Sequence, residues 1–245
     1  MKNHINTVIV CVSVIICVSI FSGSIVALKT AQNDYIVVTG SATKSFVSDL
    51  IVWRGSFSEK AQTPKEAFAK LKNGTAAVKD YLITNGVNDN EIVFSSIETN
   101  ENYDYEYNQD GRITKTIFAG YTLTQRVTIE STEIEKIEKI SRDITELIEL
   151  GVGFFSMPPE YYYTKLDELK LDLIAKSAEN TKIRAETIVK ESGAKIAKLR
   201  SASLGVFQIT PENSSTDNYS YEGSYDISAR NKTAFITTRL EYLLK

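Results

Sequence analysis

Residues 48–58 read SDLIVWRGSFS, and residues 63–66 read TPKE. The first stretch alternates polar residues with β-branched and aromatic ones, which predicts a strand with a β-bulge at Gly55. The second stretch matches a capping box, with Thr63 at the N-cap and Pro64 at the first helical position. A strand that passes directly into a helix is the first part of a mixed α+β fold.

The helix that begins after Thr63 is expected to bury one face and to end at Gly86, which suits a left-handed cap. Its apolar and small residues recur at three- and four-residue spacing, as in an amphipathic helix. The predicted buried face is Phe68, Leu71, Thr75, Val78 and Leu82. In the preceding strand, the residues expected on one face are Ile51, Trp53 and Phe57, and on the other Leu50, Val52 and Arg54.

Two long strands, 91–107 and 113–130, are joined by Asn108-Gln109-Asp110-Gly111, a strong hairpin turn sequence. The outgoing strand alternates tyrosine with acidic residues, in the order Tyr103, Asp104, Tyr105, Glu106 and Tyr107. The returning strand presents on one face Tyr121, Leu123, Gln125, Val127 and Ile129. Such a ribbon is longer than one sheet normally covers, so its tip is expected to pack on another subunit.

The second half of the chain continues to alternate helices and strands. A helix capped by Thr132 precedes a strand at 153–163, where Pro158 and Pro159 predict an edge position or a bulge. The later elements are a long helix at 164–192 and strands at 195–209 and 225–243. The apolar stripes predicted for the two helices are Ile134, Ile137, Ile144, Leu147 and Ile148, then Leu166, Leu169, Leu173, Ala178, Ala185 and Val189.

With a first strand at 35–39, the predicted order is ββαββαβαββ. Its centre, residues 48–163, has the order βαββαβ, which is the ferredoxin-like order. The predicted fold class is therefore α+β, with a mainly antiparallel sheet and three helices on one face.

Residues 5–28 contain no charged side chain and are rich in Val and Ile. About 20 apolar residues in a helix cross the hydrocarbon core of a bilayer, so this stretch is predicted to be an uncleaved transmembrane signal-anchor. The alternative is a cleaved secretory signal, because Ser22 and Ser24 have the small-x-small spacing of a cleavage site. The predicted domains are an anchor and spacer at 1–33 and a single body at 34–245.

The charges that flank the stretch predict its orientation. Lys2 precedes it and Lys29 follows it, and the free amino terminus adds a positive charge before it. The positive-inside rule then favours an N-terminus in the cytoplasm and a body in the periplasm or outside the cell. The expected location is the inner membrane, with a single pass, or the soluble periplasm if the signal is cleaved.

Composition excludes several classes of function. The chain has 28 basic and 31 acidic residues, which does not suit a general nucleic-acid binder. Its cysteines, Cys11 and Cys17, and its one histidine, His4, all lie in or beside the apolar stretch. The body is therefore expected to have no disulfide, no cysteine nucleophile and no histidine-based catalyst or metal site.

Several short sequences resemble the SIMPL-domain family, a group of bacterial envelope proteins that includes a periplasmic immunogenic protein and an oxidative-stress defence protein. Residues 36–42, IVVTGSA, are similar to the opening strand and glycine of the family, and Asp49 to the acidic residue of its second strand. Ala119-Gly120-Tyr121 resembles the start of its fourth strand. Arg184-Ala185-Glu186 with Gly193 resembles its long helix and terminal glycine.

The resemblance covers nearly all of residues 35–245, with departures at Ala42 and Ser48, where the family often has Gly and Pro. It implies an exported α+β protein that assembles into rings or channel-like homo-oligomers, with an association with envelope or oxidative stress. The family has no established catalytic site to carry over.

The candidate binding residues have simpler interpretations beside the functional ones. Asp104, Glu106 and Asp110 surround the hairpin tip and have oxygen ligands for a hard cation, but acidic residues on a ribbon also keep an edge solvated. Residues 161–163 (YYY) suit an aromatic ligand platform or ordinary packing. We therefore predict no catalytic, cofactor-binding or metal-binding residues.

Two functions follow. The first is a membrane-anchored, non-enzymatic module that forms homo-oligomers, with no nucleic acid and no cofactor. The alternative is a small-ligand-binding or stress-sensing module with a cleft near residues 161–163 and the polar loop 211–224.

Overall fold

The computed structural model describes residues 14–22, 34–214, 220 and 222–245. Most of the predicted membrane segment at 5–28 lies outside this set, and its described part, residues 14–22, is helical. Among the described residues, no helix has both the length and the apolar character needed to cross a membrane. The transmembrane anchor remains a prediction.

The chain divides into two compact units, each built from segments that are distant in the sequence. The first unit comprises Met1–Thr43, Leu171–Phe207 and Phe235–Lys245, and the second comprises Lys44–Lys170 and Gln208–Ala234. The body predicted at 34–245 thus contains all of the second unit and the part of the first unit that follows residue 33.

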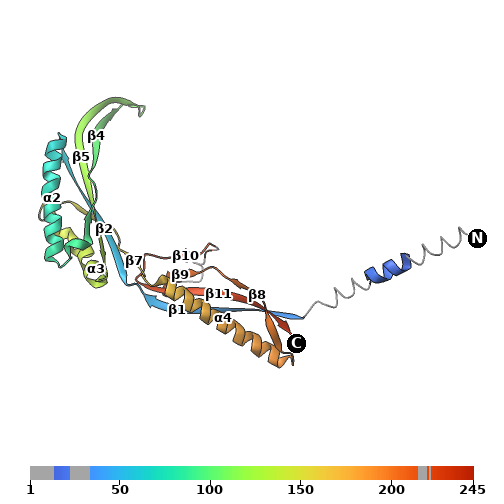
Figure 1. The fold of residues 1–245 in the computed structure, drawn as a ribbon. Coiled ribbons are helices and arrows are strands. Elements are labelled where there is room, and N and C mark those ends of the chain that lie inside the picture. Colours follow the sequence, from blue (N-terminus) through green and yellow to red (C-terminus); the bar gives the residue numbers. More distant parts are fainter. Residues whose placement is uncertain (1–13, 23–33, 215–219, 221) are drawn as a thin grey trace, which may run out of the picture. The chain divides into compact units, whose positions relative to one another are not determined.

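The second unit contains a six-stranded sheet with the order β3-β5-β2-β6, in which β4 also pairs with β5 and β7 with β2 (Figure 1). Its strands are β2 (Leu50–Ala61), β3 (Ile92–Phe94), β4 (Glu98–Tyr107), β5 (Ile113–Ser131), β6 (Phe154–Ser156) and β7 (Glu160–Tyr162). All of these pairings are antiparallel. Because β2 and β5 are central, the sheet has the predicted ferredoxin-like arrangement.

Two helices of this unit, α2 (Pro64–Thr84) and α3 (Ile134–Asp143), share one buried cluster with the sheet. The start and end of α2 are as predicted, because the Thr63 hydroxyl accepts from the Glu66 N–H at 3.3 Å and Gly86 has φ +86°. The predicted Thr132 cap of α3 is wrong. The residue at the N-cap is Glu133, whose N–H donates to the Ser131 hydroxyl at 3.1 Å.

The buried faces of these helices differ from prediction at two bulky residues. Phe68 is exposed, because α2 turns its small residues Ala67 and Gly74 to the core, and the Phe57 ring occupies the space beside Gly74. Ile148 is exposed because a 3₁₀ helix (Ile144–Ile148) follows α3 and changes the side-chain period from 3.6 to 3.0 residues.

The β-bulge predicted at Gly55 is also wrong. Pairing of β2 with β5 runs without a register shift from Ile51 opposite Ser131 to Ala61 opposite Tyr121. Gly55 instead lets the ring of Phe154 pack directly on the backbone of β2, since a Cβ there would lie 2.1 Å from that ring.

The first unit is organised around α4 (Leu166–Glu191), which packs on β1 (Tyr35–Val47) and β11 (Asn231–Leu244). Both strands belong to a five-stranded sheet with the order β1-β11-β9-β10, in which β8 (Ile196–Leu204) also pairs with β11. Its strands β9 (Gln208–Pro211) and β10 (Ser224–Tyr225) fall within the residues of the second unit. The buried residues of α4 recur every four positions and are Leu169, Leu173, Ser177, Thr181, Ala185 and Val189. The prediction that Ala178 belongs to the buried face of α4 is therefore wrong. The buried residue is the polar Ser177, because the buried face follows a four-residue spacing throughout.

Three predicted strands are each divided in two. The break at 95–97 separates β3 from β4, the one at 157–159 contains Pro158 and Pro159, and the one at 205–207 begins at Gly205. β9 (Gln208–Pro211) is the second part of the strand predicted at 195–209, and the short β10 (Ser224–Tyr225) is additional to the prediction. The observed order is therefore ββαβββαββαββββ, which corrects the predicted one, while the α+β class with three helices after residue 34 is confirmed.

Candidate functional site

The β4–β5 ribbon has one aromatic face and one polar face. Register places Tyr103 opposite Phe118, Tyr105 opposite Thr116 and Tyr107 opposite Ile113, so these side chains share one side of the ribbon. We call Tyr103, Tyr105, Tyr107, Ile113 and Phe118 the aromatic face. The polar face carries Asp104 opposite Ile117 and Glu106 opposite Lys115. The predicted alternation of the tyrosines is confirmed.

The aromatic face continues the core side of the sheet beyond the helices that cover it. Leu123 and Val127 on β5 are buried in the core, and Tyr121 on the same side packs at its margin. The β4–β5 ribbon extends past α2, as Figure 1 shows. The five residues of the aromatic face are 42–62% exposed. Exposed apolar stripes of this kind are typical of interaction sites.

A β-bulge and a glycine change the direction of the ribbon where it leaves the sheet. The register shifts between Asn102 and Tyr103, and Gly120 opposite Asn102 has φ +95°. A Cβ on Gly120 would lie 2.5 Å from the carbonyl oxygen of Ala61. Only glycine fits both the positive φ and this close approach, which explains the Gly-Tyr motif of the sequence physically.

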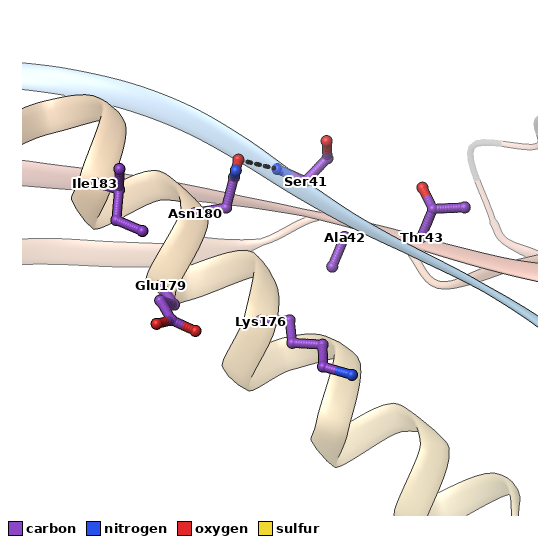
Figure 2. A pocket seen from close by; sticks show the side chains of 7 residues that line it. All are labelled: Ser41, Ala42, Thr43, Lys176, Glu179, Asn180 and Ile183. Carbon is purple, nitrogen blue, oxygen red and sulfur yellow. Dashed lines mark hydrogen bonds between the residues drawn. The ribbon is translucent and has the colours of Figure 1, made fainter. Parts of the chain in front are cut away.

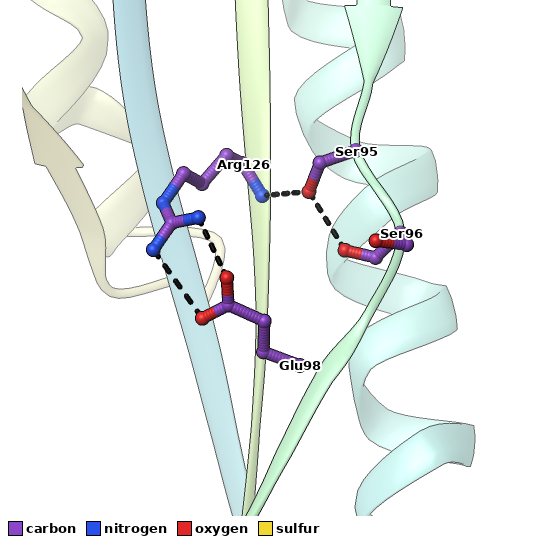
Figure 3. Close-up of polar contacts among 4 residues, drawn as sticks. All are labelled: Ser95, Ser96, Glu98 and Arg126. Carbon is purple, nitrogen blue, oxygen red and sulfur yellow. Dashed lines mark hydrogen bonds and ion pairs between the residues drawn. The ribbon is translucent and has the colours of Figure 1, made fainter.

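Polar contacts hold the base of β4 against β5 (Figure 3). Arg126 donates to both carboxylate oxygens of Glu98, at 2.7 and 3.3 Å. The Ser95 hydroxyl accepts from the Arg126 N–H at 3.1 Å and donates to the Ser96 carbonyl oxygen at 2.7 Å. Since the Arg126–Glu98 pair is about half exposed, it fixes the register of the strands more than it adds stability.

The acidic residues near the hairpin tip are spread along it rather than gathered. The turn is formed as predicted, with the Asn108 side chain accepting from the N–H groups of Asp110 and Arg112 at 3.0 and 2.9 Å. Glu106 is paired with Lys115 at 3.4 Å. In the part of the chain that the structure describes, no group of three His, Cys, Asp or Glu could hold a metal ion.

A second surface feature, the α4–β1 groove, lies in the first unit (Figure 2). The groove consists of two hollows of about 460 and 420 Å³ that share Ile183. Their lining residues are Ser41, Ala42, Thr43, Lys176, Glu179, Asn180 and Ile183 in one, and Val37, Val38, Thr39, Ile183, Arg184, Thr187 and Ile188 in the other.

Side chains of α4 reach the backbone of β1 in this groove. The Ser41 N–H donates to the Asn180 side-chain oxygen at 3.4 Å, as Figure 2 shows, and Arg184 donates to the Thr39 carbonyl oxygen at 3.3 Å. Both distances are at the long limit for a hydrogen bond, so these contacts are weak. The resemblance singled out Arg184, but no sequence pattern indicated that it would contact the edge of a strand.

The three consecutive tyrosines do not form one platform. Tyr161 donates to Glu138 at 2.9 Å, Tyr162 donates to Glu160 at 2.7 Å, and Tyr163 packs against the ring of Phe46. Burial and the bond to Glu138 raise the pKa of Tyr161 to about 12, so its hydroxyl is a donor at neutral pH. Part of the loop 211–224 that completed the predicted cleft lies outside the described residues.

Lys232 is a buried cation that the sequence analysis missed. It has no exposed surface, its ammonium donates to the Tyr161 carbonyl oxygen at 2.5 Å, and it lies 5.4 Å from the centre of the Tyr225 ring. Burial lowers the pKa of Lys232, while the charge of Asp226 acts in the opposite direction. The one sequence signal for its burial is the two-residue period of a strand, because position 232 shares a face with the buried Ala234.

This lysine predicts a pH dependence of stability. In the unfolded chain its pKa is the ordinary 10.5, so the unfolded state binds more protons between the lowered value and 10.5. The free energy of unfolding is therefore expected to rise with pH in that window. In Lys232→Met the rise is lost. Urea denaturation of the wild type and of Lys232→Met from neutral pH to 10.5 measures the free energy of unfolding at each pH. Parallel pH profiles of the two proteins would contradict the assignment of the rise to Lys232.

The chain is similar to known proteins over most of its length. The family model of SIMPL, described as a protein of unknown function (DUF541), matches residues 36–237. The uncharacterized protein YggE of Edwardsiella ictaluri (strain 93-146) is 22% identical over 198 residues, which is 78% of this chain and 76% of that protein. The family match runs from β1 into β11 and includes both the ribbon and the α4–β1 groove. The resemblance seen in the sequence is thereby confirmed, and the chain belongs to the SIMPL family.

Proposed function

We propose that this protein is a membrane-tethered module that faces the cell envelope and assembles with copies of itself through the aromatic face, without acting as an enzyme. The observation that carries the proposal is the exposed aromatic stripe, which continues the core side of the sheet. The tether is residues 5–28, whose length and lack of charge suit a membrane span. The link to envelope or oxidative stress rests on the family resemblance alone.

The energetics of a two-stranded ribbon support self-assembly. An isolated two-stranded hairpin is only marginally stable in water, so a ten-residue β4 paired with β5 alone over most of its length gains from a partner surface. Tyrosine is enriched in protein interfaces, because its ring supplies apolar area and its hydroxyl keeps a polar contact. The acidic polar face keeps the ribbon from pairing indiscriminately.

The test is the mass of the full chain in mild detergent, measured by light scattering at several concentrations. Wild-type protein is expected to assemble. In Tyr105→Ser/Tyr107→Ser the assembly weakens, because each interface tyrosine is expected to contribute about 1 kcal/mol. Their joint loss of about 2 kcal/mol raises the dissociation constant roughly 30-fold.

The matched control is Ile117→Ser, which removes an exposed apolar residue from the polar face of the same ribbon. Its mass is expected to equal that of the wild type. Wild-type protein that stays monomeric at micromolar and higher concentration would overturn the proposal. Equal weakening in the control would assign assembly to the ribbon in general and not to its aromatic face.

A further inference from the structure

The strand β1 lies at one end of its sheet, and β11 is its one partner among the described strands. On its outer edge, α4 supplies the two weak contacts from Asn180 and Arg184 to the β1 backbone. By occupying backbone N–H and C=O groups at the strand edge, these side chains hinder nonspecific pairing of β1 with strands of other molecules. Since both bonds are long, an incoming strand that offers better-placed backbone groups can replace them.

The groove beside this edge has an apolar wall. Ile183 and Ile188 of α4 are 54% and 53% exposed and line the same hollow as Val38, which packs on Ala185 of α4. An unpaired strand edge beside an apolar helix wall is the arrangement that receives an added β-strand, because the backbone supplies affinity and the wall selects side chains.

The two sides of the sheet at this edge differ in chemistry. Val38 and Leu240 pack with Ala185 on the helix side, so the neighbouring Thr39 and Arg239 point to the open side. Arg184 at the edge and Arg239 on the open side are both exposed cations. The groove therefore fits a strand with apolar side chains on one side and acidic side chains on the other.

One strand of this same protein has that pattern. Among the strands that the structure describes, β4 pairs with β5 alone, so its other edge is open there. Its aromatic side chains alternate with Asp104 and Glu106 along the strand. The acidic β4 is complementary in charge to Arg184 of the groove and to Arg239 on the open side of the sheet, whereas β8, with Lys198 and Arg200, is not.

We propose that the open edge of β4 in one copy adds to β1 in a second copy, with its tyrosines against Ile183 and Ile188 and its acidic residues toward Arg239. This inference rests on the proposed self-assembly and names the surface that receives the aromatic face. The contact is heterologous, so repetition builds a ring or a filament rather than a closed two-fold dimer.

Engineered cysteines test the contact directly, because the native cysteines are only Cys11 and Cys17. In the full chain with both replaced by serine, Asp104→Cys is made in one preparation and Thr39→Cys in another. The two proteins are mixed and mildly oxidised. Disulfide-linked dimer is expected to exceed that of either protein alone by at least about tenfold, since adjacent sites have a high effective concentration.

Two further variants make the result decisive. Ser203→Cys on β8, the exposed strand at the other side of β11, is the matched control and is expected to give no cross-link with Asp104→Cys. Ile183→Asp, which places a charge on the groove wall, is expected to reduce the assembled mass as strongly as the tyrosine variants do.

The outcomes separate the two proposals. Assembly that depends on Tyr105 and Tyr107 but gives no Thr39–Asp104 cross-link, with Ile183→Asp unaffected, would overturn the β4–β1 contact and leave the proposed function standing. Asp104→Cys that cross-links to itself as well as in the mixture would indicate symmetric pairing of ribbons and overturn it too. A monomeric wild type would overturn both.

Discussion

Trp53→Ala is expected to lower the free energy of unfolding of the second unit by about 3–5 kcal/mol, the range for removing a fully buried large aromatic side chain. Trp53 has no exposed surface, and its ring lies 5.8 Å from that of Phe154. Its indole N–H donates to the Ser156 hydroxyl at 3.1 Å, and that hydroxyl donates to the Ser141 carbonyl oxygen at 2.9 Å. The substitution therefore leaves both a cavity and a broken hydrogen-bond chain.

Urea denaturation of the full chain followed by circular dichroism measures this loss, because Trp53 is the one tryptophan and its fluorescence disappears with it. Phe155→Ala is the matched control, since Phe155 is an aromatic residue of the same unit that is 64% exposed. Its expected change is within about 0.5 kcal/mol. A Trp53→Ala protein as stable as this control would contradict the assignment of Trp53 to the core.

Gly40→Ala is expected to destabilise the first unit by about 3 kcal/mol, the upper end of the cost of overpacking. A Cβ at this position would lie 2.4 Å from the Thr181 hydroxyl oxygen, 2.7 Å from its backbone nitrogen and 2.8 Å from its Cα. A side chain can rotate away from such a contact, but the backbone of α4 can only move as a whole. The helix would lift from β1, and the buried stripe of α4 would lose contact.

Hydrogen exchange resolved by peptide distinguishes this local effect from general unfolding. In Gly40→Ala, peptides from α4 are expected to exchange roughly 100-fold faster, which corresponds to about 3 kcal/mol, while peptides from α2 keep their protection. Gly153→Ala is the control, because a Cβ there has no atom within 4 Å. Equal loss of protection in α2 and α4 would show that the glycine does not act through the α4–β1 contact.

Three of the residues that carry the family resemblance now have physical roles. Gly40 permits the close approach of α4, and Gly120 permits the turn of the ribbon at its bulge. Asp49 accepts from the N–H and the hydroxyl of Thr164, both at 2.7 Å, and so fixes the chain just before α4 begins. Each role is a constraint on backbone position, which explains why small and acidic residues carry the resemblance.

Predictions from local sequence succeeded where the information is local. The capping box at Thr63, the hairpin turn at Asn108 and the alternation of tyrosines along β4 all depend on a few neighbouring residues, and the structure shows each of them. The order of strands and helices between residues 48 and 163 was also enough to indicate the ferredoxin-like sheet.

The errors arose where a residue's environment is supplied by distant parts of the chain. Gly55 looked like a bulge but accommodates Phe154, about a hundred residues later in the sequence. Phe68 and Ile148 are as hydrophobic as their buried neighbours, but they lie outside the buried core and are 49% and 61% exposed. Hydrophobicity alone does not distinguish these cases, because burial depends on which element packs across from the residue.

The sequence by itself determined the α+β class, the family, the aromatic and acidic alternation of the ribbon, and an uncharged stretch at 5–28 that predicts a membrane tether. Only the tertiary structure decided that the aromatic face lies uncovered beyond the helices, that Lys232 is buried, and that α4 leaves a groove along the edge of β1. The physical reason is that periodicity and turn chemistry act over a few residues. Exposure, close approach and burial of charge are properties of surfaces that meet only after the chain has folded.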